Sequence, residues 1–341
     1  MDTIARVVGV SKTTVFRALH NKGRINPDTR ERILHVAREL GYRPNLIARS
    51  LRLQRTSTIG VVPIGLAGWF YSHVLEGVDE VAQMREHGVL IACSYGSPDK
   101  ERKNIQMLLD KRVDGLLVAP TDPEENRAFY EELIALQIPV VFIDRYIPGL
   151  PLDCVATDNE QGGYLATKHL LELGRRRIVF VSTASRERRA TSVVGRFSGY
   201  RKALAEHGIQ HFVELGPGVP DILPEEEYAY KTVSHYLEKG GHLDGAFAVN
   251  DDIAYGTIRA LQTHGLRVPE DVSVIGFDDQ DTSAFISPPL TTVAQPMREI
   301  GRQATALLLE RIARGMSDPP QQLLLTPSLV VRQSCGAQQE K

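Results

Sequence analysis

The stretch GVSKTTVFRALHNKGRINPDTRERI, residues 9–33, contains the signals of two short helices that follow a first one. Gly9 ends the first helix, because the apolar residues just before it have helical spacing. Ser11 is a good N-cap for a second helix over about residues 12–21, and Asn26 followed by Pro27 is a strong start signal for a third. Three short helices with a glycine turn between the first two predict a helix-turn-helix unit.

The second helix of this unit has two different faces. The mostly apolar face, which can pack, carries Val15, Ala18, Leu19 and Lys22. The opposite face carries Lys12, Phe16 and His20, with Thr13 and Arg17 beside them. Such a unit places its second helix in the major groove with its N-terminal residues at base edges, so Lys12 and Thr13 lie where bases are reached. Arg17 can donate a bidentate pair to guanine. A three-helix bundle with a basic surface remains the alternative.

The remaining DNA candidates of this head, residues 1–44, come from its turn and its third helix. Asn26 and Thr29 open the third helix, where backbone N–H groups can bind a phosphate. The candidate DNA-contacting residues of the head are Ser11, Lys12, Thr13, Phe16, Arg17, Arg24, Asn26 and Thr29.

The charge distribution favours a polyanion as the partner of the head. The 341-residue chain has a formal net charge of −2, but residues 1–57 contain 12 Lys and Arg against 4 Asp and Glu. The N-terminal segment therefore carries +8 and the remainder carries −10. A small basic head on an acidic body suggests nucleic acid as a partner, although a solvated basic surface is the plainer interpretation.

A short segment after the head predicts a hinge over residues 45–57. Asn45 can cap a helix from Leu46 to Leu53, which is too short to be stable alone. A basic segment of marginal stability is a candidate for folding on DNA, and Leu51 could wedge between base steps from the minor groove. Asn45 and Leu51 are therefore further DNA-binding candidates. An amphipathic interdomain linker is the alternative.

Several classes of protein and site are disfavoured by the sequence. No run of about 18 apolar residues exists, and the N-terminus carries no secretory signal, so no membrane association is expected. Cys93, Cys154 and Cys335 lie far apart and match neither a disulfide framework nor a zinc site, and the histidines lack metal-ligand spacing. We expect a cytoplasmic protein without metal or cofactor.

From residue 58 the sequence alternates buried strands with helices, which predicts a doubly wound parallel sheet. The expected strands are 58–64, 88–94, 114–120, 139–144, 176–182, 245–250 and 271–279. Three segments echo each other in order. They pair EHGV at 86–89 with EHGI at 206–209, 113–120 with 243–250, and the strand before Asp144 with the one before Asp278. The body should therefore consist of two similar α/β lobes.

Polar residues at the carboxyl ends of these strands predict a ligand cleft between the lobes. They are Phe70, Tyr71, Ser94, Thr121, Asp144, Arg145, Arg196, Asn250, Asp251, Asp278 and Asp279. Carboxylates, an amide, an arginine and aromatic rings suit a polyhydroxylated ligand. Plainer roles remain open, because Asn250 and Asp251 can cap the next helix and Asp144 with Arg145 can form a local ion pair.

These motifs together resemble one family. GVSKTTVFRALHNKGRINPDTRERI, ELGYRPNLIARSLR and STIGVV resemble the DNA-binding head, hinge helix and first body strand of LacI-type transcription regulators. GLAGWFYSHVLEGV, GRFSGYRKAL, AVNDDIAYGTIRAL, VIGFDD and PPLTTVAQPMREIG resemble the periplasmic-binding-protein-like effector domain of that family. The resemblance covers essentially the whole chain.

The resemblance implies roles for individual residues. Lys12, Thr13 and Arg17 would read bases, Leu51 would be the minor-groove wedge, and Phe16 stands where the family usually has a small residue. Phe70, Arg196, Asn250, Asp278 and Gln295 would line the effector cleft, with Asp144 beside them. Together with Tyr71 and Thr121 from the strand-end argument, these residues form the predicted effector site.

The resemblance also implies three chain crossings between the lobes and a homodimer, since the tetramer-forming leucine-heptad tail is missing. The lobes would comprise about 58–157 plus 290–316, and about 158–289 plus 317–332, followed by a disordered tail at 333–341.

Enzymatic alternatives have less support. The sequence contains no G-x-S-x-G motif, P-loop or complete G-x-G-x-x-G motif. Two carboxylates across a cleft could act as an acid and base pair in a sugar-cleaving enzyme, but this leaves the basic head unexplained. A sugar-transport protein is the other alternative. We expect instead a repressor, not an enzyme, that binds double-stranded operator DNA under the control of a small molecule, either a sugar or a sugar derivative.

Overall fold

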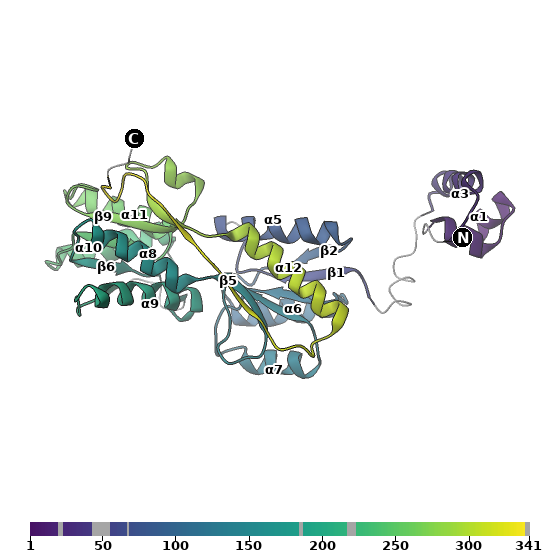
Figure 1. Cartoon of the computed structure of the whole chain (residues 1–341), viewed down its shortest axis with the longest axis horizontal. Helices are drawn as coiled ribbons and strands as arrows, with labels where there is room; N and C mark the ends of the chain where they lie inside the picture. Colours follow the sequence, from purple (N-terminus) through teal and green to yellow (C-terminus); the bar gives the residue numbers. More distant parts are fainter. Residues whose placement is uncertain (20–22, 43–54, 67, 184–186, 217–222, 338–341) are drawn as a thin grey trace. The chain divides into compact units, whose positions relative to one another are not determined.

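The computed structural model describes residues 1–19, 23–42, 55–66, 68–183, 187–216 and 223–337. It divides into two compact parts, the head over residues 1–56 and the body over residues 57–341 (Figure 1). Each part has its own buried core, and each is described by itself below. Asn45 and Leu51, the two hinge candidates, lie outside the described residues.

The head contains the three predicted helices, α1 (Asp2–Val8), α2 (Lys12–Leu19) and α3 (Pro27–Glu39). The predicted boundary signals are confirmed. Gly9 adopts a left-handed conformation with φ 75° after α1. The Ser11 hydroxyl accepts a hydrogen bond from the Thr14 N–H at 3.1 Å, and the Asn26 side chain accepts from the Asp28 N–H at 2.9 Å. Local capping therefore fixes the end of α1 and the starts of α2 and α3.

A small apolar cluster holds the three helices of the head together. It comprises Ile4, Val8, Val15, Ala18, Ile33 and Ala37. Leu40 lies at helical spacing from Ile33 and Ala37, which would continue their buried stripe, but it is 49% exposed. The reason is that α3 ends at Glu39, so the side chain of Leu40 leaves the helical repeat that faces the core.

The body contains two six-stranded sheets (Figure 1). The first sheet is parallel and has the order β11 (Gln322–Leu325), β5 (Asp153–Thr157), β4 (Val140–Ile143), β3 (Leu116–Val118), β1 (Thr58–Val62) and β2 (Gly88–Ile91). The second has the order β12 (Ser328–Val330), β10 (Thr291–Ala294), β9 (Ser273–Asp278), β8 (Gly245–Ala248), β6 (Ile178–Val181) and β7 (Val213–Leu215). In the second sheet only β12 is antiparallel to its neighbour within the described residues. The predicted class, two doubly wound lobes, is confirmed.

Helices cover both faces of the first sheet. α5 (Trp69–Met84) and α12 (Met297–Arg314) share one apolar cluster with the sheet. α6 (Pro98–Asp110) and α7 (Arg127–Ala135) share a second cluster with its other face. In the second lobe α8 (Asn159–Glu172) packs on α9 (Thr191–Glu206), and α10 (Glu225–Glu238) packs on α11 (Asp251–Thr263).

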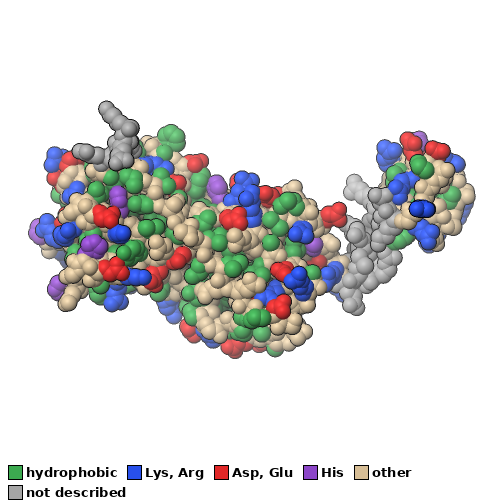
Figure 2. Space-filling view, in the orientation of Figure 1, with side chains coloured by type: hydrophobic (Ala, Val, Ile, Leu, Met, Phe, Trp, Pro, Cys, Tyr) green, Lys and Arg blue, Asp and Glu red, His purple; other side chains and the backbone are tan. Residues whose placement is uncertain are grey.

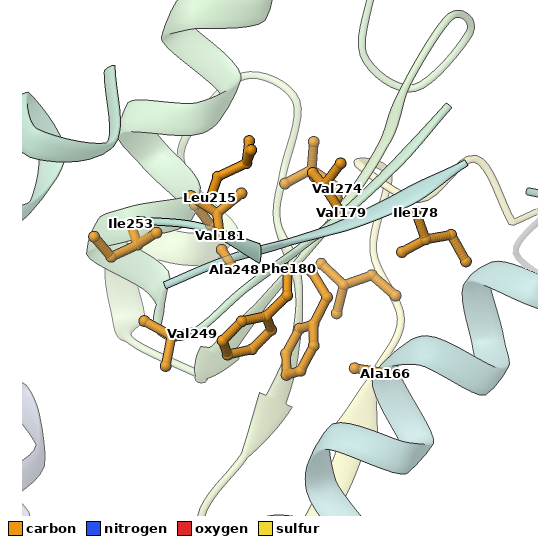
Figure 3. Close-up of a cluster of buried hydrophobic side chains, with 14 of the residues drawn as sticks. Ala166, Ile178, Val179, Phe180, Val181, Leu215, Ala248, Val249, Ile253 and Val274 are labelled. Atoms are coloured by element: carbon orange, nitrogen blue, oxygen red, sulfur yellow. The ribbon is translucent and has the colours of Figure 1, made fainter. Parts of the chain in front are cut away.

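The core of the second lobe has the alternation expected of a strand buried on both faces. In Figure 3, Phe180 of β6 lies on one side of the sheet with Ala166 of α8, and Val179 and Val181 lie on the other side. Successive side chains of a strand point to opposite faces, so a continuous apolar run satisfies both helical layers. This is why the sequence run IVFV predicts a central strand.

The internal repeat predicted from the sequence extends to the helices. Gly163, Ala166 and Thr167 of α8 have the same spacing as Gly301, Ala304 and Thr305 of α12. In each helix the threonine hydroxyl donates a hydrogen bond to the carbonyl of its glycine, at 2.9 Å in α8 and 2.8 Å in α12. Each helix follows the fifth strand of one lobe, counted in chain order, and packs in the other lobe: α8 follows β5 and packs in the second lobe, and α12 follows β10 and packs in the first. The two lobes therefore share these internal contacts as well as their strand order.

Glycines allow close approach of the helix pairs that are equivalent in the two lobes. A Cβ atom added to Gly199 of α9 would lie 2.0 Å from the Glu160 carbonyl oxygen of α8, and one added to Gly77 of α5 would lie 2.0 Å from the Arg298 carbonyl oxygen of α12. Neither obstacle is a side chain that can rotate away. The backbones of each pair therefore pack closely only because no side chain stands between them.

Gly199→Ala is expected to lower the free energy of unfolding of the body by about 2 kcal/mol or more, because helices α8 and α9 must separate to admit the methyl group. Gly65→Ala is the matched control, because an added Cβ atom meets no atom within 4 Å there. Urea unfolding followed by circular dichroism measures both. Equal stabilities of the two variants would contradict the close-packing argument.

The lobe boundaries differ from the predicted ones at two strands. β10 (291–294) was assigned to the first lobe but pairs with β9 in the second sheet, and β11 (322–325) was assigned to the second lobe but pairs with β5 in the first. The chain crosses after β10 rather than before it, because Thr291–Ala294 continues the parallel ladder along Ile275–Asp278. The predicted number of three crossings agrees with the order of strands in the two sheets.

The predicted disordered tail at 333–341 is wrong over its described part. Ser334 and Cys335 are buried in the second lobe. The Ser334 hydroxyl donates to the Val274 carbonyl at 2.6 Å and accepts from the Thr291 N–H at 2.8 Å. The tail is ordered because its polar groups complete the hydrogen bonding of β9 and β10, which a short polar sequence does not reveal.

Candidate functional sites

The exposed face of α2 carries the predicted base-reading residues. Lys12, Thr13 and Arg17 are exposed and Phe16 is half-buried, whereas Val15 and Ala18 of the same helix are buried. The predicted division of α2 into a packing face and an outward face is therefore confirmed for residues 12–19, whereas His20 and Lys22 lie outside the described residues. Figure 2 shows the head with basic side chains at its surface, and acidic and basic side chains interspersed over the visible face of the body.

Lys12 has a protein partner in the DNA-free head. Its ammonium group lies 2.9 Å from the Asp2 carboxylate, and both side chains are exposed. The hydrogen bond and charge of Lys12 lower the pKa of Asp2. Because exposed ion pairs contribute little free energy, this one does not prevent Lys12 from binding another anion.

Asn26 and Thr29 lie at the start of α3, where a phosphate contact was predicted. Asn26 uses its side-chain oxygen to cap the helix, so its local role is structural whether or not DNA is bound. Arg24, two residues before Asn26, and Ser11, directly before α2, are exposed. Contacts of these four residues with DNA remain predictions.

A cavity of about 290 Å³ lies between the two lobes at the carboxyl ends of their strands. Seven of the eight residues predicted for the effector cleft line it: Phe70, Tyr71, Asp144, Arg196, Asn250, Asp278 and Gln295. These residues are spread over more than 200 positions of the sequence, and the two α/β lobes bring them together as the strand-end argument requires.

The first-lobe wall of the cavity combines aromatic rings with an ion pair. The Tyr71 hydroxyl at the start of α5 donates to Asp144 Oδ2 at 2.8 Å, and Arg145 Nε lies 3.2 Å from the same oxygen. The ring of Phe70 lies edge-on to that of Tyr71, with centroids 5.1 Å apart. The predicted Asp144–Arg145 ion pair is thus present, and Asp144 also belongs to the cavity wall.

Arg196 is held rigidly in the second-lobe wall. Its Nε donates to Asn159 Oδ1 at 2.9 Å, and its Nη1 donates to the Val249 carbonyl at 2.7 Å. The guanidinium carbon also lies 3.8 Å from the centroid of the Phe277 ring. The remaining Nη2 lies 4.0 Å from Asp278 Oδ1, so the edge of the guanidinium that is not used by Asn159 and Val249 is directed at Asp278.

Burial dominates the electrostatics of this pair. It lowers the pKa of Arg196, and it raises the pKa of Asp278 well above its usual value although the charge of Arg196 opposes that rise. Gln295 Nε2 donates to Asp278 Oδ1 at 2.5 Å, and Gln295 Oε1 accepts from the Thr157 hydroxyl at 2.6 Å. Gln295 lies where the chain crosses between lobes, so it connects the ligand wall to the crossing segments.

Asn250 has both of the roles considered for it. Its side-chain oxygen caps α11 by accepting from the Ile253 N–H at 2.9 Å, and it lines the cavity. Its amide nitrogen donates to Glu225 Oε2 at 2.6 Å. Asp251, the other residue of this pair, is buried behind the wall, where burial raises its pKa to about 6 despite hydrogen bonds from Ser283 and Thr292.

Thr121 is not among the residues that line the cavity, which corrects its assignment to the effector site. Its backbone N–H donates to Glu101 Oε2 at 2.7 Å, within a buried cluster that includes Asn126 and Tyr130. Burial raises the pKa of Glu101. The need to satisfy this buried carboxyl draws the chain after β3 away from the cavity.

Two contacts join the lobes at the rim of the cavity. Arg189 forms an ion pair with the buried carboxylate of Asp122, and the Tyr146 N–H donates to the Thr191 hydroxyl at 3.1 Å. Asp122 and Tyr146 belong to the first lobe, whereas Arg189 and Thr191 belong to the second. Any change in lobe separation must therefore lengthen or break these contacts.

Several lining residues were not predicted from the sequence. They include Trp69, Ser192, Glu225, Asp252 and Gln280. Trp69 and Asp252 are sequence neighbours of predicted residues, so one further step along each helix would have included them. Glu225 follows a loop rather than a predicted strand, and no local pattern distinguishes it.

The described residues contain no helix long and apolar enough to span a membrane. Among them there is likewise no group of three or more His, Cys, Asp or Glu side chains that could hold a metal ion.

Comparisons with known proteins agree with both parts of the chain. Residues 1–45 match the family described as bacterial regulatory proteins, lacI family, and residues 167–335 match the periplasmic binding protein-like domain. The HTH-type transcriptional regulator GalS of Salmonella typhimurium is 36% identical, with 98% of this chain and 96% of GalS covered. The ribose operon repressor of Haemophilus influenzae is 32% identical, with 98% of each chain covered.

Solved structures extend the likeness to the arrangement of the fold. A crystal structure of the lac repressor dimer bound to operator and the anti-inducer ONPF has a TM-score of 0.85 at 26% identity, with 98% of each chain covered. The family match of the head, the full-length relatives and this structural likeness agree with the helix-turn-helix unit and the two-lobed cavity. This chain belongs to the LacI family of bacterial regulatory proteins.

Proposed function

We propose that this transcriptional regulator is a cytoplasmic repressor whose affinity for operator DNA depends on a small sugar or sugar derivative bound between the two lobes. One observation carries the proposal. A single chain combines an outward helix face bearing Lys12, Thr13 and Arg17 with a polar cavity elsewhere in the same molecule. As a member of this family the chain is a DNA-binding regulator and not an enzyme, so the cavity serves to bind its ligand rather than to transform it.

The cavity supports a hydroxyl-rich ligand. Asp144, Asp278 and Asn250 offer acceptors for hydroxyl groups, and the Trp69 and Phe70 rings offer surfaces for the C–H faces of a sugar. One relative is named as a ribose operon repressor, which is consistent with a sugar.

Coupling between ligand and DNA requires that the ligand bind two lobe arrangements with different affinity. The rim contacts Asp122–Arg189 and Tyr146–Thr191 support this mechanism, because they depend on the separation of the lobes. In this proposal the ligand shifts the separation, and the hinge at residues 45–57 transmits the shift to the heads. The wedge role of Leu51 and the DNA contact of Asn45 belong to the same proposal.

The function is tested by selecting operator sequences from random duplexes with the full chain and then titrating sugars into the complex. We expect one enriched sequence with two related half-sites, and a sugar that changes its affinity at least tenfold. Failure to enrich any sequence, or an enriched operator whose affinity no small molecule changes, would contradict the proposal.

The edge of the first sheet supports a homodimer. β2 is the edge strand, and it exposes Leu90 and Ile91 at 40% and 44% although parallel strands are normally covered on both faces. Met84 at the end of α5 and Met107 on α6 are also exposed, at 67% and 43%. A second copy of the chain would cover this apolar surface, and the lac repressor structure is itself described as a dimer.

Ile91→Glu is expected to convert the protein to a monomer and to weaken operator binding at least tenfold, because two linked heads bind two half-sites more tightly than one. The control is Leu136→Glu, which places the same charge on a residue that is 70% exposed at the end of α7. Sedimentation velocity and operator titration measure the two effects. A dimeric Ile91→Glu variant would place the interface elsewhere.

A further inference from the structure

Two helices of the second lobe begin at the wall of the cavity with carboxylates in their first turns. Glu225 is the first residue of α10, and Asp252 is the second residue of α11. Both side chains line the cavity. Glu226, Glu227 and Asp251 follow or flank them in the same first turns.

Helix N-termini ordinarily attract anions, because their N–H groups lack partners within the helix and carry partial positive charge. Here the chain supplies its own anions. The Asn250 side chain occupies the Ile253 N–H, and its amide nitrogen is directed at Glu225 Oε2. The positive ends of α10 and α11 are therefore compensated by protein carboxylates before any ligand enters.

The cationic groups of the cavity also have partners within the protein. Arg196 donates to Asn159 and Val249, and Arg145 lies beside Asp144. Among the described lining residues, the ionisable side chains are the carboxyl groups of Asp144, Glu225, Asp252 and Asp278 and the guanidinium groups of Arg145 and Arg196. Burial raises the pKa of Asp278 well above its usual value, so Asp144, Glu225 and Asp252 supply the negative charge. A ligand phosphate or carboxylate would meet this excess of negative charge in a partly desolvated space, where like charges repel strongly.

The volume of the cavity limits the size of the ligand. At about 290 Å³ it lies at the lower end of the range for small-molecule sites, roughly 300–1,000 Å³. A single ring with its hydroxyl groups fits such a space.

We propose that Glu225 and Asp252 make this cavity selective against anions, so that its ligand is an uncharged, hydroxyl-rich single ring, and phosphorylated or carboxylated forms of that ring are rejected. This inference rests on the proposed function and specifies the ligand of that same site. It assigns a selectivity role to Glu225 and Asp252. Glu226 and Glu227, in the same first turn as Glu225, are exposed and do not line the cavity.

The experiment uses the full chain and matched ligands. The uncharged probes are glucose, galactose, mannose, fructose, ribose, xylose and arabinose. Each hexose is paired with its 6-phosphate, ribose is paired with its 5-phosphate, glucose and galactose are also paired with their uronic acids, and maltose and adenine complete the panel. Thermal shift identifies binders and calorimetry gives Kd. We expect at least one uncharged monosaccharide to bind, and its anionic form to bind at least 30-fold more weakly.

Charge-neutral variants test the two residues directly. Glu225→Gln with Asp252→Asn is expected to reduce the ratio of Kd for the sugar phosphate to Kd for the sugar at least tenfold. Glu226→Gln with Glu227→Gln changes the net charge equally on exposed residues and should leave the ratio unchanged. Asp252→Asn alone, with an expected reduction of at least threefold, replaces the double variant if the latter does not fold.

Four results would overturn the inference: an anionic sugar that binds as tightly as its neutral form, a preference for maltose or adenine, no binding by any uncharged monosaccharide, or an unchanged ratio in the Glu225 and Asp252 variants. Operator titration separates these failures from failure of the proposed function. A sugar phosphate that releases operator DNA refutes the selectivity and leaves the function standing. A neutral sugar that binds without altering operator affinity refutes the proposed function and leaves the selectivity intact.

Discussion

A chain that begins at Ser57 is expected to lose operator binding entirely while its two lobes stay folded. The head holds the exposed face of α2 and a separate apolar core, and the body holds its own clusters on both sheets. Residues 1–56 carry a net charge of +8, so their removal leaves a body with an excess of ten negative charges. Such a body should be repelled by DNA at low salt.

The measurement is a titration of selected operator and random duplexes with the full and the shortened chain at several salt concentrations. For the full chain, log Kd should rise with log salt concentration by about 0.9 for each phosphate that the heads neutralise. Circular dichroism and the thermal shift with a bound sugar report folding of the shortened chain. A folded body that still binds operator with the affinity of the full chain would refute the assignment of DNA binding to the head.

Arg17→Ala tests specificity within the same assay, because Arg17 is exposed on α2 and its predicted role is to read a base. Its loss should weaken operator binding more than random-DNA binding, by about 1–3 kcal/mol. Arg267→Ala is the control, since this arginine pairs with Asp271 on the surface of the body. Equal losses on operator and random DNA would make Arg17 a phosphate contact only.

Short-range rules predict most of the fold. The caps at Ser11 and Asn26 are decided within three residues of sequence, and the central strands are recognisable because each is a continuous apolar run. β5, β7 and β10 were not predicted, because they are short and contain polar residues such as Asp153, Glu214 and Thr291. Their pairing depends on neighbours far along the chain, as do the lobe crossing after β10 and the burial of Ser334.

The same distinction explains the effector site. Residues directly after an apolar strand, such as Asp144, Asn250 and Asp278, were predicted because parallel strands bring their carboxyl ends to one edge. Thr121 satisfies the same rule and is absent from the cavity, because a buried carboxyl at Glu101 draws its backbone aside. Glu225 satisfies no strand-end rule, and only the packing of α10 on α11 brings it to the wall.

Asp278→Asn is expected to abolish the response to effector while operator binding persists. Asp278 accepts from Gln295 and faces the Nη2 of Arg196, so it belongs to a hydrogen-bonded network that a ligand hydroxyl would join. Replacement of one carboxylate oxygen by an amide NH₂ turns an acceptor into a donor and places it against other donors. The sugar then loses a hydrogen bond in a buried site and keeps a hydroxyl without a partner, which should weaken binding at least 100-fold, or about 2.7 kcal/mol.

Asp279→Asn is the matched control, because Asp279 is the next residue, changes by the same charge, and pairs with Arg332 instead of facing the cavity. Arg196→Ala should lose the response as well, but it should also lower the melting temperature, since it removes the partners of Asn159 and Val249. Asp278→Asn therefore separates ligand binding from stability more cleanly than Arg196→Ala.

Calorimetry gives the sugar affinity, and operator titration with and without sugar gives the response. Sugar binding and operator release are thermodynamically linked. A variant whose operator affinity still responds fully to sugar must therefore have kept the difference in sugar affinity between the two lobe arrangements. A full response in Asp278→Asn would therefore mean that the effector contacts the chain elsewhere.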